Sequence, residues 1–148
     1  MFRRLSTMLF LGAVLGGCYT METSSERITL NMQALRGDAQ AQADLGQLLE
    51  KGRGAKVDYV EAAEWYRKAA EKGNPDGQHR LGMLYAQGYG VPKDPIEAYK
   101  WLAIAAGQPG GGTEAAQSLY MRNRLAQEMT PEQVAEGQRR AESWKPKP

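Results

Sequence analysis

The sequence predicts an all-α protein, a short right-handed solenoid of stacked antiparallel helix pairs. Sliding the chain by 36 residues places a long series of residues on identical partners, from Leu45 on Leu81 to Ala70 on Ala106. Each 36-residue unit holds two stretches with apolar residues at helical spacing, separated by a Gly-x-Gly turn. Residues that favour helix N-termini precede these stretches. The repeat, the spacing and the punctuation together predict stacked helical hairpins.

The N-terminus has the layout of a secretory signal peptide, residues 1–17. Residues 1–4 form a short, positively charged segment. Residues 5–14 form an apolar run whose length suits a signal sequence but is too short for a membrane span. The segment ends in Leu-Gly-Gly-Cys, where Cys18 is the single cysteine of the chain. The sequence therefore predicts export of the domain that follows.

The stretch LGGC resembles the lipobox of bacterial lipoproteins, which implies that Cys18 becomes a lipidated N-terminus. Two or three acyl chains hold a protein stably, since each buried CH₂ contributes roughly 0.8 kcal/mol. Tyr19 stands where an aspartate favours inner-membrane retention in many such lipoproteins, so the resemblance implies an outer-membrane protein facing the periplasm. Residues 18–27 are then the lipidated cysteine and a polar tether. The alternative is cleavage elsewhere, which leaves Cys18 as a free thiol.

The charge balance argues against a nucleic-acid partner. The formal charge of the whole chain is +2, but Arg3 and Arg4 lie in the predicted signal peptide. Without them, 17 Lys and Arg face 17 Asp and Glu, and the two signs are interleaved along the chain.

The predicted repeat domain covers residues 28–145. Residues 28–37 align with the end of a second helix and are expected to cap the N-terminal face of the solenoid. The first full repeat, about 38–73, breaks at Gly52-Arg53-Gly54, and Asp58 with Glu61 forms a predicted capping box. The apolar stripe of its second helix is predicted to comprise Ala62, Trp65, Tyr66 and Ala69.

The second repeat, about 74–109, follows the same plan. Asn74 and Asp94 each precede a proline and are predicted N-caps, with Glu97 completing a second capping box. Gly46 and Gly82 lack the bulk that would hold paired helices apart, so close helix packing is expected there. The predicted inner residues of this repeat are Leu81, Leu84, Tyr85, Ala98, Trp101, Leu102 and Ala105.

These two units resemble the Sel1-like repeat, a relative of the tetratricopeptide repeat. The stretches ADLGQLLEKGRGAKVDYVEAAEWYRKAAEKGN and HRLGMLYAQGYGVPKDPIEAYKWLAIAAG share its LG, GxG, D, A, W and AA positions. The resemblance implies a solenoid built from stacked helical hairpins.

The pattern weakens in residues 113–145, where we expect a terminal helical hairpin. Thr113 is the predicted cap of a helix through Leu125, and Thr130 with Gln133 is the predicted start of the next. Residues 146–148 cannot continue a helix and are expected to fray. The expected packing residues of the hairpin are Ala116, Leu119, Tyr120, Leu125, Val134, Ala141 and Trp144.

The chain offers little for catalysis. His79 is the single histidine and has no nucleophile or second metal ligand at helical spacing. Asp58 and Asp94 are explained as helix caps. We therefore expect a protein that is not an enzyme, with no metal and no cofactor. An enzymatic role would require His79 to titrate abnormally beside a carboxylate in a closed pocket.

The expected function is a lipid-anchored adaptor that holds a protein or peptide segment of the cell envelope on its concave face. The alternative is a structural accessory that contacts peptidoglycan or an exported polysaccharide. Sugar binding favours exposed aromatic residues in the groove, whereas most tyrosines and tryptophans here fall at core positions. The expected partner-binding residues are Gln40, Gln47, Glu50, Asp76, His79, Met83 and Gln87.

Overall fold

The computed structural model describes residue 25 and residues 27–53 and 56–148, which form helices and turns with no strand among them. Ser25 and residues 27–35 are helical, so the last described residues of the predicted tether already belong to a helix. The predicted signal peptide and Cys18 lie outside the described residues. The helices that follow are α2 (Ala39–Lys51), α3 (Tyr59–Glu71), α4 (Pro75–Gln87), α5 (Pro95–Ala106), α6 (Gly112–Ala126) and α7 (Pro131–Ser143).

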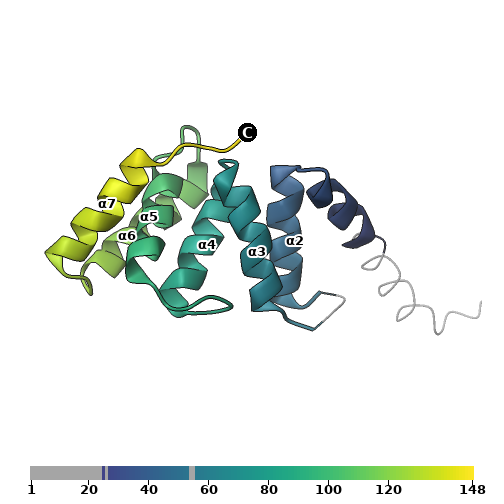
Figure 1. Ribbon diagram of the computed structural model, residues 1–148, viewed down its shortest axis with the longest axis horizontal. Coiled ribbons are helices and arrows are strands. Elements are labelled where there is room, and N and C mark those ends of the chain that lie inside the picture. Colours follow the sequence, from purple (N-terminus) through teal and green to yellow (C-terminus); the bar gives the residue numbers. More distant parts are fainter. Residues whose placement is uncertain (1–24, 26, 54–55) are drawn as a thin grey trace, which may run out of the picture.

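The helices stack side by side as an elongated solenoid, as predicted (Figure 1). Helix α2 packs on α3 and α4 packs on α5, while α3 and α4 join the two pairs. Ala34 of the N-terminal helical segment is buried in the same core, so this segment covers the end of the stack. The predicted stripes of α3 and α5 are all buried.

Close packing depends on the two predicted glycines. A Cβ on Gly46 would lie 2.7 Å from Tyr66 Cε1, and one on Gly82 would lie 2.8 Å from Leu102 Cγ. Both distances are shorter than carbon atoms tolerate, so α2 and α4 reach their partners only because these positions lack a side chain.

The caps of the two repeats form as predicted, but the capping boxes do not close. Asn74 accepts a hydrogen bond from the Gly77 amide at 2.8 Å, and Asp94 accepts from the Glu97 amide at 3.0 Å. The Glu61 carboxylate accepts instead from Trp65 Nε1 at 3.3 Å, and Glu97 pairs with groups elsewhere. The backbone amides of Asp58 and Asp94, which a closed box would use, donate instead to the carbonyls of Leu49 and Tyr85 in the preceding helix.

Buried amides tie each repeat to the one before it. Gln42 Nε2 donates to the Ala34 carbonyl at 3.0 Å, and Gln78 Nε2 donates to the Ala70 carbonyl at 3.2 Å. The two bonds are one repeat length apart, so they form a regular clamp. The next position in this register is Glu114, where the clamp ends.

The last two helices differ from the predicted hairpin. Helix α6 begins after Gly111 without a side-chain cap, and Thr113 lies inside it. Helices α6 and α7 pack on α5 more extensively than on each other. Helix α7 approaches closely because Gly137 lies against Tyr99, where a Cβ would be 2.7 Å from the ring. Helix α7 starts at its Thr130 N-cap as predicted, and Thr130 and Gln133 form a closed capping box there.

The packing face predicted for α6 is wrong. Leu119 and Tyr120 are 43% and 64% exposed, and Ala116 is exposed too. The residue that faces inward is Ser118, whose exposure is 0%. Serine at the position of Gly46 and Gly82 still fits the tight contact, which turns the apolar side of α6 outward.

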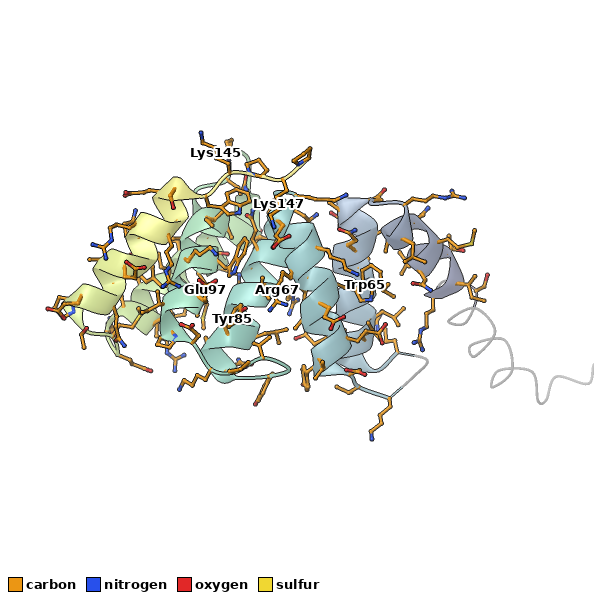
Figure 2. All side chains as sticks on the ribbon, in the orientation of Figure 1. Trp65, Arg67, Tyr85, Glu97, Lys145 and Lys147 are labelled. Carbon is orange, nitrogen blue, oxygen red and sulfur yellow. The ribbon has the colours of Figure 1, made fainter. Side chains whose placement is uncertain are left out.

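The C-terminal tail is held in place, contrary to the expectation that it frays. The Lys147 amide donates to the Glu71 carbonyl at 2.7 Å, and its ammonium lies 2.9 Å from the Glu71 carboxylate. Trp144 packs edge-on against Trp101 with ring centroids 6.1 Å apart. These contacts carry the chain back over the solenoid to α3, where Figure 2 labels Lys147.

Candidate functional site

A groove runs along the face formed by α2, α4 and α6. Its central hollow, about 470 Å³, lies between α4 and α6. A second hollow of about 300 Å³ shares His79 and Gln117 with it and extends to α2. A third, about 210 Å³, shares Met121 and extends past Gln87 to the end of α6. We call these connected spaces the groove, and its parts the central, polar and distal hollows.

The central hollow is mainly apolar. Met83 from α4 faces Ala116, Tyr120 and Met121 from α6. Tyr120 is 64% exposed, so a large aromatic ring is available to a bound molecule. Methionine side chains adapt to irregular apolar partners, and an aromatic ring offers a broad contact surface. This hollow is therefore suited to an apolar side chain.

The polar hollow carries mainly acidic groups. Asp44 from α2, Asp76 from α4 and Glu114 from α6 line it, together with Arg80. Arg80 lies 3.8 Å from the Glu50 carboxylate, a loose ion pair at the protein surface. Three lining carboxylates therefore stand against one guanidinium, which itself has an acidic neighbour.

Glu50 holds Tyr66, one of the residues that line the polar hollow. The Tyr66 hydroxyl donates to Glu50 Oε2 at 2.6 Å. Burial of the phenol, followed by the hydrogen bond and the charge of Glu50, raises the pKa of Tyr66 well above its ordinary value. Tyr66 therefore stays protonated and acts as a fixed donor. Glu50, predicted as a binding residue, serves this internal network.

His79 lies where the central and polar hollows meet. Its Nδ1 is 2.8 Å from Ser118 Oγ, and the ring tautomer decides which of the two donates. Burial, followed by the charge of Arg80, lowers the pKa of His79, although Asp76, Glu114 and Glu50 act in the opposite direction. His79 is therefore neutral at pH 7.

The Ser118–His79 pair is not arranged as a nucleophile and its base. Ser118 has no exposed surface, so its hydroxyl cannot reach an external substrate. The bond joins α4 to α6 instead, and its role is to hold the two walls of the groove together.

The structure brings five of the seven predicted binding residues to the groove. Gln40 lies outside it, since its amide donates to Asp44 at 3.0 Å and its oxygen accepts from Asn74 at 3.0 Å. Glu50 lines none of the three hollows and instead accepts the hydrogen bond of Tyr66. The five that line the groove are Gln47, Asp76, His79, Met83 and Gln87.

The sequence interpretation missed the wall contributed by α6. Residues such as Tyr120 and Met121 were assigned to packing or left unassigned, because their apolar character alone does not indicate which side faces inward. The repeat register held the missing signal. Ser118 aligns with Gly46 and Gly82, which face the paired helix. The surface of α6 that flanks Ser118 therefore corresponds to the surfaces of α2 and α4 that line the groove.

The described residues contain no group of histidine, cysteine and acidic side chains that could hold a metal ion. In this part of the chain, no helix is both long and apolar enough to cross a bilayer.

Comparison with known proteins identifies the repeat. Residues 39–74 and 75–109 each match the model of the Sel1 repeat. The chain contains two Sel1 repeats. Sel1 repeat proteins are generally protein-interaction modules, and they typically act as non-catalytic scaffolds. A comparison with curated protein sequences finds no match.

Solved Sel1 repeat structures resemble most of the chain. One is a protective antigen present in uropathogenic Escherichia coli strains that displays an SLR fold, with 30% identity and a TM-score of 0.73 over 86% of this chain and 27% of that one. Another is a Sel1 repeat protein from Oxalobacter formigenes, with 41% identity and a TM-score of 0.56 over 62% of this chain and 26% of that one. The chain thus spans about a quarter of each of these proteins.

Proposed function

We propose that this protein is a non-enzymatic adaptor whose groove holds a segment of a partner protein. The observation that carries the proposal is the apolar central hollow, which leaves Met83 and Tyr120 open beside polar side chains. Full burial of one such side chain is worth about 1.5–3 kcal/mol, so a partner that covers this hollow gains appreciable affinity. The interaction role of Sel1 repeats agrees with this proposal.

The proposal extends to a location: the chain is anchored through lipidated Cys18 at the outer membrane and faces the periplasm. The end of the solenoid nearest Cys18 in sequence carries exposed Ile28, Met32 and Leu35. The equivalent positions of the first repeat hold charged residues, Glu64, Lys68 and Glu71. An apolar stripe that begins ten residues after Cys18 is suited to contact with the bilayer that holds the lipid.

A second candidate is an envelope accessory that contacts peptidoglycan or an exported polysaccharide. Tyr120 is the observation in its favour, because an exposed aromatic ring at a groove can stack on a sugar face. A single aromatic ring provides little contact for a sugar. An apolar peptide side chain in the central hollow would contact Met83 and Met121 as well as Tyr120.

In-cell photocrosslinking tests the groove. A photoreactive residue replaces Gln47 or Met83 in turn, and Glu64 on the exposed side of α3 serves as the control site. The adaptor predicts one discrete protein captured from both groove sites and not from Glu64. Capture of glycan fragments would favour the accessory, and equal labelling at all three sites would contradict any role for the groove.

Cell fractionation tests the anchor. The full chain should sediment with outer membranes, and Cys18→Ala should lose the lipid and release the protein. Mass spectrometry of the mature N-terminus provides the direct measurement. A Cys18 thiol found unmodified in the mature protein would rule out the lipoprotein.

A further inference from the structure

We propose that the partner segment carries a basic residue close to a large apolar residue, with the apolar side chain in the central hollow and the basic one in the polar hollow. This inference rests on the proposed protein-binding function and assigns the chemical class of the segment. It follows from the placement of two unlike hollows side by side, which share His79 and Gln117.

The apolar half of the argument depends on α6. Tyr120 and Met121 align with Leu84 and Tyr85, which pack in or against the core, yet they border an open hollow of about 470 Å³ facing Met83. That volume lies in the range of ligand sites and accommodates a bulky side chain. The occupant that removes the most apolar surface from water is a large aliphatic or aromatic residue.

The polar half depends on charge complementarity. Asp44, Asp76 and Glu114 come from three different helices and converge on one hollow. Among the described residues, Asp76 and Glu114 make no side-chain hydrogen bond or ion pair, although both occupy first turns of helices. Two helix N-termini contribute about +0.5 each, and Arg80 contributes one positive charge, so the three carboxylates leave the hollow negative.

His79 does not neutralise this charge. Burial keeps its imidazole uncharged at pH 7, so the boundary between the hollows is polar but carries no cation. Acidic side chains alone would not define a ligand. Their position at the end of an apolar hollow selects lysine or arginine next to a large apolar residue over a purely apolar or acidic segment.

Selection from a random peptide phage library on the full-length lipidated protein in detergent tests this inference. The enriched peptides should combine lysine or arginine with a large apolar residue nearby. Synthetic copies should bind more weakly as salt is raised, because screening weakens the ionic contact. Replacing their basic residue by norleucine should lower the affinity and abolish the salt dependence.

Matched variants assign each half of the segment to its hollow. Asp76→Asn and Glu114→Gln should each weaken binding up to about fivefold, as expected for partly exposed ion pairs, and should reduce selection for basic residues. Tyr120→Ala should weaken binding about tenfold. Glu64→Gln and Leu119→Ala, which alter exposed residues that do not line the groove, should leave binding unchanged.

The outcomes separate this inference from the proposed function. Peptides that depend on Tyr120 but lack basic residues, or carry acidic ones, would overturn the inference and leave the groove as a protein-binding site. Circular dichroism checks that the protein used for selection is folded. If neither the folded wild-type protein nor any folded variant enriches a peptide, both the groove function and the inference fail.

Discussion

Helices α4 and α6 occupy equivalent positions in successive units of the solenoid, yet they are held by different means. Asn74 caps α4, and Gln78 clamps it to the Ala70 carbonyl. In α6 no side chain caps the first turn, and Glu114 stands where the clamping glutamine would be. In the regular repeat these polar residues hold the stack together. In the third unit the equivalent residue, Glu114, lines the groove instead.

The same contrast applies to the apolar residues. Leu81 of α4 is fully buried, while Gln117 in the equivalent position of α6 lines the groove. Ser118 replaces the glycine and bonds to His79 across the groove. Departure from the repeat pattern therefore coincides with the candidate site. In a repeat protein, the positions that lose the pattern are informative about function.

The largest expected effect separates these two equivalent positions. Leu81→Ala should lower the free energy of unfolding by about 2–5 kcal/mol, because it opens a cavity in the core. Gln117→Ala should change it by less than about 0.5 kcal/mol. Urea denaturation followed by circular dichroism measures both. Equal losses would mean that α6 packs like a regular repeat helix.

The buried clamp should have the next largest effect. Gln78→Met preserves the approximate volume but leaves the Ala70 carbonyl without its donor, and it also removes the acceptor of Gln108 Nε2 at 3.0 Å. We expect a loss of about 1–3 kcal/mol in the free energy of unfolding. Glu114→Met, at the equivalent position, should cause no such loss. The contrast fails if both variants unfold at the same urea concentration.

The cap should matter less than the clamp. Asn74→Ala removes the acceptor for the Gly77 amide and should cost about 1 kcal/mol. Thr113→Ala, at the site once predicted to cap α6, should cost almost nothing because Thr113 lies inside the helix. Thermal unfolding of the two variants compares these positions directly. A loss in Thr113→Ala equal to that in Asn74→Ala would restore the predicted cap.

The regular repeats were predictable because periodicity and punctuation agree there. Leu81, Trp65 and Trp101 recur at fixed spacing, and the pattern alone places them in the core. Asn74 and Asp94 precede prolines, which fixes the helix starts. Local preference and tertiary packing point to the same structure in this region.

The third unit and half of the groove could not be predicted from the same evidence. Leu119 and Tyr120 look like packing residues in any pattern based on hydrophobicity, and only tertiary contacts with α5 turn them outward. The capping boxes failed for a similar reason. Glu97 has a stronger partner in Arg140 of α7, at 2.8 Å, than in its own backbone. In both predicted boxes the N-cap amide donates to a carbonyl of the preceding helix, a contact that no local pattern indicates.

The smallest expected effect concerns the bond that joins the regular repeat to the third unit. His79 has a lowered pKa in the folded protein, so below about pH 6.5 the unfolded chain takes up the proton first. Stability should therefore fall as the pH drops below that value. His79→Asn retains a polar atom near Ser118 but does not titrate, so its stability should fall less between pH 7.5 and pH 5.5.

Urea unfolding of both proteins at the two pH values gives the required difference. Asp76, Glu114, Glu50 and Arg80 surround His79 in either protein, so their own pH responses largely cancel in the comparison. A smaller pH-dependent loss in His79→Asn would show that the neutral imidazole helps to join α4 to α6. Identical losses would mean that His79 gains its proton without strain, and that the groove keeps its walls in place when this residue is charged.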